Sequence, residues 1–200
     1  IFAWSVGWTR ELFARQPIRG RGWMWVAVAV VLATNLLRFI ALDYDKAGIV
    51  MVLSWLLVGL FIGFAEEVLT RGLVVQLMRR AGYREIAVAL VSAALFAAMH
   101  AGNIFDGQGA LATIIQVGYT FAFGLLMYLA YRVTGRLIVP ILLHASTDPS
   151  IFLLTAYPSE GPLAAFAGTG NIWVILAGIV LLIVLIFNGG KDRAFPRTTP

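Results

Sequence analysis

Six ionisable residues lie inside strongly apolar stretches of the sequence. They are Glu66, Glu67, Arg71, His100, His144 and Asp148. Charged groups inside an apolar span cost on the order of a few kcal/mol each, so they usually face a polar interior and serve a function. Carboxylates and imidazoles that meet in such an interior can activate water, move protons or bind a metal ion. These residue types therefore favour hydrolytic chemistry, proton transport or a metal site.

The spacing around the two adjacent glutamates predicts different roles for them. Glu67 and Arg71 are four residues apart, so on a helix they share one face and form a favourable ion pair. Glu66 is rotated from Glu67 by about 100° around the helix and has no cation four residues further on. We therefore expect Glu67 to be an orienting partner and Glu66 to point into the interior as a general base.

Two prolines accompany the last pair of polar residues, His144 and Asp148, which are also four residues apart. Pro140 removes a backbone donor four residues before His144, and Pro149 disfavours helical geometry at Asp148. We expect this helix to be kinked or interrupted at the histidine. Irregular backbone inside a membrane is tolerated where it lines a cavity, so such an interruption would mark one.

The composition indicates a lipid environment. The 200 residues are 60% apolar and only 12% charged, about half the charged fraction of an average soluble protein. The absence of cysteine excludes disulfides, thiolate metal sites and cysteine nucleophiles. The net charge of +5 is distributed in short basic clusters beside apolar runs. This distribution is typical of a membrane topology signal and argues against nucleic acid as a partner.

Six apolar runs are long enough, or nearly so, to cross a hydrocarbon layer of about 30 Å as helices. They are 23–42, 49–65 with its continuation through 68–78, 86–99, 110–131, 137–157 and 172–187. The 86–99 run is short, which leaves a buried or re-entrant helix as an alternative. The expected fold is an all-α, polytopic transmembrane bundle of about six spans around a membrane-embedded polar cavity. It would occupy residues 23–188, with the polar motifs inside 49–157.

Basic residues accumulate on one side of these spans. Twelve of them lie in the segments 10–21, 79–84, 132–136 and 191–197, whereas the opposite loops contain only Lys46. Because Lys and Arg accumulate in cytoplasmic loops, both termini are predicted to be cytoplasmic. Residues 1–22 are predicted either to lie along the membrane surface or to be the remainder of a truncated upstream span. Residues 189–200 are predicted to form a disordered cytoplasmic tail.

Depth within the membrane places the polar residues at similar levels. At about 1.5 Å per residue from the nearest cytoplasmic boundary, Glu66, His100, His144 and Asp148 lie roughly 20, 22, 12 and 18 Å deep. We therefore expect these four to meet in one cavity. Arg38 is close to a span end and is expected to extend to the membrane surface. Small residues expected to serve close helix packing are Gly59, Gly63, Ala93, Ala94, Ala97 and Ala98.

Three classes of intramembrane protease are excluded because their motifs are missing. The sequence contains no GxSG serine of the rhomboid type, no GxGD aspartate of the presenilin type and no HExxH zinc motif. The polar residues that remain in the apolar helices combine glutamate with histidine.

The remaining motifs are Glu66-Glu67-x-x-x-Arg71, Phe96-x-x-x-His100 and His144-x-x-x-Asp148, in this order on successive apolar helices. Together they resemble the CPBP (Abi) family of CAAX prenyl proteases and bacteriocin-processing or self-immunity proteins, over residues 49–157. The resemblance implies that Glu66 is the base that activates water and His100 its partner, while Glu67 and Arg71 shape the site. It also implies that His144, with position 148, stabilises the oxyanion. Because an ionised Asp cannot donate a hydrogen bond, we expect Asp148 to orient His144 instead.

The predicted function is hydrolysis of a peptide bond near the C-terminus or membrane boundary of a membrane-associated peptide or CAAX-like substrate. Its partners would be the lipid bilayer and this peptide or protein substrate. Glu66, His100 and His144 also make a plausible zinc set, so metal dependence is open at this stage. The alternatives are a proton-coupled transporter and a catalytically silent scaffold or immunity protein. The missing inverted repeat disfavours the transporter, and the intact motifs disfavour the silent protein.

Overall fold

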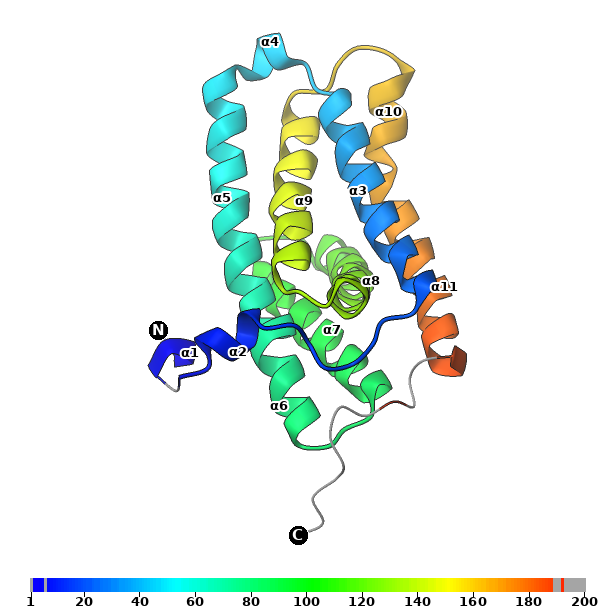
Figure 1. The fold of residues 1–200 in the computed structure, drawn as a ribbon. Coiled ribbons are helices and arrows are strands. Elements are labelled where there is room, and N and C mark those ends of the chain that lie inside the picture. The colour runs from blue at the N-terminus through cyan, green and yellow to red at the C-terminus, as the bar shows by residue number, and fades with distance from the viewer. Residues whose placement is uncertain (1, 6, 189–191, 193–200) are drawn as a thin grey trace.

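The chain folds into an all-helical bundle in the computed structural model, which describes residues 2–5, 7–188 and 192 (Figure 1). The α-helices are α1 (Phe2–Ser5), α2 (Thr9–Phe13), α3 (Trp25–Ile40), α4 (Tyr44–Ala47), α5 (Ile49–Glu67), α6 (Val75–Arg80), α7 (Glu85–Ala101), α8 (Ala110–Thr134), α9 (Ile138–Ala156), α10 (Pro162–Gly168) and α11 (Gly170–Asn188). Two 3₁₀ turns, η1 (Gly22–Met24) and η3 (Gly102–Ile104), and one π-helical segment, η2 (Val68–Val74), complete the described chain.

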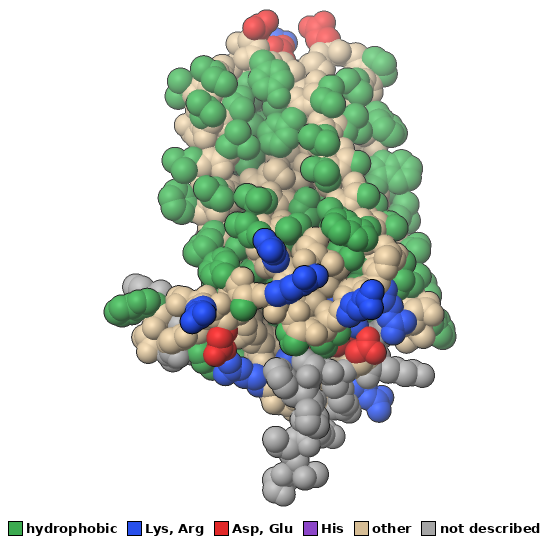
Figure 2. Space-filling view, viewed as in Figure 1, with side chains coloured by type: hydrophobic (Ala, Val, Ile, Leu, Met, Phe, Trp, Pro, Cys, Tyr) green, Lys and Arg blue, Asp and Glu red, His purple; other side chains and the backbone are tan. Residues whose placement is uncertain are grey.

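Within the described residues, six helical segments are long and apolar enough to cross a membrane, as the sequence predicts. They are Gly22–Ile40, Ile49–Arg80, Glu85–Ile104, Ala110–Thr134, Ile138–Ala156 and Pro162–Asn188. The third segment, for which a re-entrant helix was the alternative, is 20 residues long, which is sufficient for a full span. Large apolar side chains cover the sides of the bundle, and this surface matches lipid rather than water (Figure 2).

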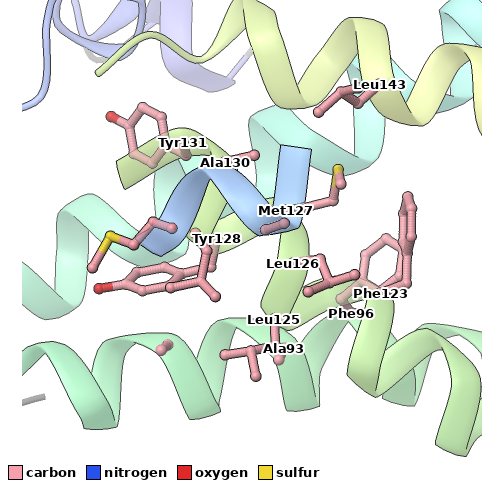
Figure 3. Close-up of a cluster of buried hydrophobic side chains, with 14 of the residues drawn as sticks. Ala93, Phe96, Phe123, Leu125, Leu126, Met127, Tyr128, Ala130, Tyr131 and Leu143 are labelled. Atoms are coloured by element: carbon pink, nitrogen blue, oxygen red, sulfur yellow. The ribbon is translucent and has the colours of Figure 1, made fainter. Parts of the chain in front are cut away.

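The centre of the bundle is α8, which is seen nearly end-on in Figure 1. Every residue from Ala122 to Arg132 is buried, because α3, α7, α9 and α11 all pack against this helix. Its aromatic side chains lie among Ala93 and Phe96 of α7 and Leu143 of α9 (Figure 3). This core fixes the relative positions of α7 and α9, and α5, which carries the two glutamates, packs in turn against α9.

The two ends of the bundle differ in charge. Most Lys and Arg side chains in view gather at the end where α2 and α6 lie, and acidic side chains gather near α4 at the other (Figure 2). At the acidic end, the hydrogen bond and ion pair with Lys46 hold the pKa of Asp43 below its usual value. The cytoplasmic orientation of the basic end stays a prediction.

The two terminal segments flank this basic end. The short helices α1 and α2 lie crosswise to the bundle there (Figure 1), and Leu12 of α2 is buried in the core. The surface location predicted for residues 1–22 stays a prediction. The tail predicted for 189–200 lies outside the described residues, apart from Asp192.

Close packing between α5 and α9 depends on two glycines. A side chain at Gly63 would place its Cβ 2.7 Å from the Ala145 nitrogen and 2.9 Å from the Ile141 oxygen, both backbone atoms of α9. At Gly59 the Cβ would collide with the Ala145 carbonyl and the Pro149 ring. The prediction that Gly59 and Gly63 serve helix packing is therefore confirmed.

The small face predicted on α7 is only half correct. Ala93 and Ala97 are buried, and the Cα of Ala93 lies against Gly124 of α8. Ala94 and Ala98 are exposed instead. The four alanines lie on two adjacent sides of α7, and only the side with Ala93 and Ala97 packs against α8.

We predict that Gly63→Ala lowers the stability of the bundle by about 1–3 kcal/mol, since backbone atoms cannot move aside as a flexible side chain does. The matched control is Gly118→Ala on α8, where a Cβ meets nothing within 4 Å. Unfolding in detergent or nanodiscs measures both variants. Equal stability of the two would contradict the packing argument.

The prolines predict irregular backbone in α9, but the irregular segment lies in the second span, directly after α5. Helix α9 runs without interruption from Ile138 to Ala156, so the interruption predicted at His144 is wrong. Pro140 falls in the first turn, where its missing N–H costs little. The carbonyl of Ala145, which Pro149 leaves without a donor, faces Gly59 of α5 instead.

The irregular segment is the π-helix η2, which follows Glu66 and Glu67 directly. π-Helical turns within α-helices are rare and occur frequently at functional sites. Here the turn lies within the second span, at the point where the predicted apolar run 49–65 continues past the two glutamates into 68–78.

Candidate active site

Glu67 and Arg71 form the predicted ion pair, and both side chains are fully buried. Arg71 Nη1 lies 3.0 Å from Glu67 Oε1, and the same guanidinium donates to Thr70 Oγ1 at 2.6 Å. Its Nη2 donates to the Gly124 carbonyl of α8 at 2.6 Å. The ion pair therefore joins the π-helical segment to the central helix.

Glu67 also holds His144 of α9. Its Oε1 lies 3.0 Å from His144 Nδ1, and the histidine is only 2% exposed. Because a carboxylate only accepts, Nδ1 carries the hydrogen in this bond. Arg71, Glu67 and His144 thus form a buried relay that fixes the orientation of the imidazole and directs Nε2 away from Glu67.

Two carboxylates approach His144 Nε2. Glu66 Oε2 lies 3.9 Å away and Asp148 Oδ2 lies 3.7 Å away. Both side chains are partly exposed, at 27% and 28%. The Oε2 atom of Glu66 is itself buried and has no hydrogen-bond partner among the described residues. The lone pairs of this oxygen are therefore available to a ligand.

His100 is connected to His144 by aromatic rings that pack between the two histidines. Its Nδ1 lies 3.0 Å from the Phe96 carbonyl, so Nδ1 donates and Nε2 is left as an acceptor. Phe96 packs against both histidines, with ring centroids 5.0 Å from His100 and 5.4 Å from His144. Phe123 of α8 covers another side of His144, with ring centroids 5.1 Å apart. Sequence reasoning did not find Phe123, because nothing distinguishes it locally from other core aromatics.

A cavity of about 460 Å³ opens beside these residues between α7, α8, α9 and α11. His100 and Asp148 line it, and apolar side chains form most of the remaining wall. The other polar lining residues are Gln116, Tyr119, Thr120 and Asn171. The polar residues expected to meet inside the membrane therefore lie on or next to one cavity. A second cavity of about 630 Å³ at the basic end is lined by Arg15, Arg19, Arg21 and Arg132 and by none of the six site residues.

The zinc set suggested by the sequence does not fit the donor geometry. Zinc requires three or four donors about 2.0–2.3 Å from one point. In the described part of the chain, no three His, Cys, Asp or Glu side chains are arranged to hold a metal ion. These side chains therefore act without a bound metal ion in the mechanism proposed below.

Arg38 does not extend to the membrane surface, contrary to the prediction. It is 2% exposed, and its Nη2 donates to Asn171 Oδ1 of α11 at 2.8 Å. The hydrogen bond to a buried amide on another helix stabilises Arg38 inside the bundle more than hydration at the membrane surface would. No local sequence pattern shows which helix supplies that amide. Asn35, one turn earlier on α3, was the available signal, since a polar amide in an apolar span indicates an inward-facing side.

The fold and the site define a polytopic membrane protein with a buried glutamate–histidine centre facing a membrane-embedded cavity. Residues 48–150 match the family described as type II CAAX prenyl endopeptidase Rce1-like. The chain belongs to this family, which agrees with the predicted resemblance to CPBP intramembrane proteases. It is thus a multi-pass membrane protein of a family of CAAX-type endopeptidases. No curated protein and no solved structure matches the chain.

Proposed function

We propose that this protein hydrolyses a peptide bond of a membrane-associated peptide by direct attack of a water molecule that Glu66 activates. The observation that carries the proposal is the buried, unpartnered Oε2 of Glu66, 3.9 Å from His144 Nε2. This separation is longer than a direct hydrogen bond, yet it lets both atoms reach one oxygen. A carboxylate with free lone pairs in a water-poor site is suited to general base catalysis.

The side chains of the site account for each proton transfer in the proposed hydrolysis. Glu66 takes one proton from water while the water oxygen bonds to the scissile carbonyl carbon. His100 Nε2, left as an acceptor by the Phe96 hydrogen bond, accepts the second hydrogen of the water and orients it. The tetrahedral intermediate then collapses, the C–N bond breaks, and the proton held by Glu66 passes to the leaving nitrogen. No acyl-enzyme forms.

His144 supplies the electrophilic side of the site in this proposal. In this role His144 is the imidazolium, whose Nδ1–H donates to Glu67. Nε2, which faces the carboxylates of Glu66 and Asp148, carries the second hydrogen and donates it to the oxyanion that develops on the carbonyl. The fixed orientation matters because an oxyanion donor is effective only when it is held in place before the reaction. Asp148, 3.7 Å from the same nitrogen, stabilises the protonated ring and completes its orientation.

The experiment is hydrolysis of a membrane-peptide library by the purified protein in detergent, with both products identified by mass spectrometry. We expect cleavage at one bond type, and we expect a strong chelator to leave the rate within about twofold, since the donors do not form a metal site. Loss of cleavage in chelator, restored by zinc, would replace this mechanism with a metal-dependent one.

The proton-coupled transporter is the competing function, because the same groups can relay protons. It requires ionisable groups that lead from the centre toward both membrane faces. The site residues instead gather around His144 Nε2 and one cavity, which supports catalysis. A proton flux in proteoliposomes together with no cleavage of any peptide would favour the transporter.

A further inference from the structure

A cavity of about 630 Å³ at the basic end carries positive charge that the proposed hydrolysis does not use. Four arginines line it, namely Arg15, Arg19, Arg21 and Arg132, and we call it the arginine cavity. Three of them are exposed, whereas Arg132 is fully buried. An adjoining cavity of about 510 Å³ shares Arg19 and Arg21 and adds one carboxylate, that of Asp192. The arginine cavity is therefore accessible from outside and has a positively charged wall.

The described chain supplies little negative charge to balance these arginines. Asp192 accepts a hydrogen bond from Arg132 and lies 3.7 Å from Arg21. In the part of the chain that the structure describes, Arg15 and Arg19 take part in no ion pair. The carboxylate of Asp192 shows that an oxyanion fits between two of the guanidiniums. Guanidiniums bind phosphate oxygens through paired N–H groups, so the arginine cavity suits a phosphate.

The segment that carries three of the arginines, residues 15–21, is fixed to the end of α8. Gln16 is only 8% exposed. Its side chain donates to the Arg132 carbonyl at 3.0 Å, and its backbone N–H donates to the Gly135 carbonyl at 2.9 Å. A Cβ at Gly20 would lie 2.7 Å from the Arg132 oxygen and would collide with the backbone of α8. Backbone contacts therefore hold the arginines around the cavity.

The arginine cavity lies where the apolar sides of the bundle give way to basic side chains (Figure 2). Trp25, the first residue of α3, lines it and is 53% exposed. Tryptophan concentrates at the headgroup level of membranes. Leu32 and Leu36 follow on the same exposed face of α3, seven and eleven residues further along. An apolar stripe on which an acyl chain can lie therefore leads away from the cavity.

We propose that the arginine cavity binds the phosphate headgroup of an anionic phospholipid. Arg15, Arg19 and Arg21 contact the phosphate oxygens, and the buried Arg132 adds positive charge from the cavity wall. The acyl chains lie along the stripe of α3 that begins at Trp25. Basic pockets at the ends of membrane-spanning helices recognise lipid headgroups in this way. The inference is independent of the proposed hydrolysis, because none of the six candidate site residues lines this cavity.

The first test measures thermal unfolding of the purified, delipidated protein in detergent with added short-chain lipid. A ligand that binds only the folded protein raises the Tm in proportion to its affinity and concentration. We expect dioctanoyl phosphatidylglycerol to raise the Tm clearly more than dioctanoyl phosphatidylcholine, and added salt to reduce the difference. Inorganic phosphate and glycerol phosphate at the same concentrations should have little effect, because they lack the apolar chains.

Two results of this titration would overturn the inference. Equal stabilisation by phosphatidylcholine would show that negative charge is not recognised. Equal stabilisation by inorganic phosphate would assign the cavity to a soluble phosphate rather than to a lipid.

Charge variants test whether the cavity, rather than the general charge of this end, binds the lipid. Replacing its three exposed arginines by Gln should weaken binding of phosphatidylglycerol by at least about tenfold; these changes are Arg15→Gln, Arg19→Gln and Arg21→Gln. The matched control removes the same charge from three exposed arginines of the basic end that do not line either cavity, and should change the affinity by less than about twofold; these are Arg10→Gln, Arg84→Gln and Arg136→Gln. Equal weakening in the two triple variants would reject the cavity as the site.

A second pair of variants changes the geometry and keeps every charge. Gly20→Ala displaces the arginine segment from α8, where a Cβ has no room, and should weaken lipid binding several-fold. Gly22→Ala is the control, since a Cβ there meets nothing within 4 Å. Each Tm shift is taken relative to the same variant without lipid, so a general loss of stability does not enter. Unchanged lipid affinity in Gly20→Ala would contradict a preformed site, and no arm of the test depends on peptide cleavage.

Discussion

Exchange of Glu66 for Gln is expected to lower kcat for peptide hydrolysis by at least about 10³. The proposed mechanism uses this carboxylate twice, first as the base that takes a proton from water and then as the acid that gives it to the leaving nitrogen. General acid–base catalysis contributes about 10²–10⁴ per group, and the amide of Gln can do neither step. The fold should not change, because Glu66 Oε2 has no hydrogen-bond partner to lose.

The measurement is the initial rate of peptide cleavage, accompanied by a thermal unfolding curve for each protein. Glu160→Gln is the matched control, since it makes the same chemical change at an exposed loop position and should leave the rate unchanged. Wild-type activity in a folded Glu66→Gln protein would reject Glu66 as the base.

Exchange of Arg71 for Met is expected to lower the stability of the bundle by about 3–5 kcal/mol, the cost of removing one partner of a buried ion pair. Glu67 would then be a carboxylate with no exposed surface that has lost its guanidinium partner and keeps only His144 as a partner of opposite charge. The Gly124 carbonyl and the Thr70 hydroxyl would lose their shared donor as well. Lys46→Met, which breaks the exposed pair with Asp43, should leave stability nearly unchanged.

A double variant separates the structural role of this pair from its role at the site. Replacement of both partners by neutral residues of similar size, Glu67→Gln with Arg71→Met, removes the buried carboxylate together with its guanidinium and should recover most of the lost stability. It should not recover activity, because His144 Nδ1 loses its carboxylate partner. Unfolding in nanodiscs and cleavage rates on the same samples measure both effects. Full activity in a stable double variant would show that the Arg71–Glu67–His144 relay is not needed for catalysis.

The two adjacent glutamates divide their tasks because of the helix geometry around them. Successive positions on a helix point about 100° apart, so Glu67 turns into the core toward Arg71 while Glu66 turns toward His144 Nε2. The π-helical turn that begins at Val68 starts directly after this pair. One short segment therefore supplies both the buried ion pair of the site and the carboxylate that we propose as the base.

The sequence by itself determined the membrane class, the six spans and the Glu67–Arg71 pair. Each of these depends on local properties: the length of apolar runs, the total charge, and a four-residue spacing that brings two side chains to one helix face. The same local reasoning correctly assigned Gly59 and Gly63 to packing, since small residues allow membrane helices to approach closely.

Only the tertiary structure decided which groups from different helices meet. Glu67 hydrogen-bonds His144 across 77 residues of sequence, and Arg38 finds its amide partner at Asn171 across 133 residues. The helix that carries Pro149 is continuous from Ile138 to Ala156, and Gly59 of α5 leaves space beside the carbonyl that this proline leaves free. Such partners depend on how helices rotate and pack against α8, which is a property of the whole bundle rather than of any local pattern. The sequence thus identified the candidate site residues, while packing between the helices decided how their side chains are oriented.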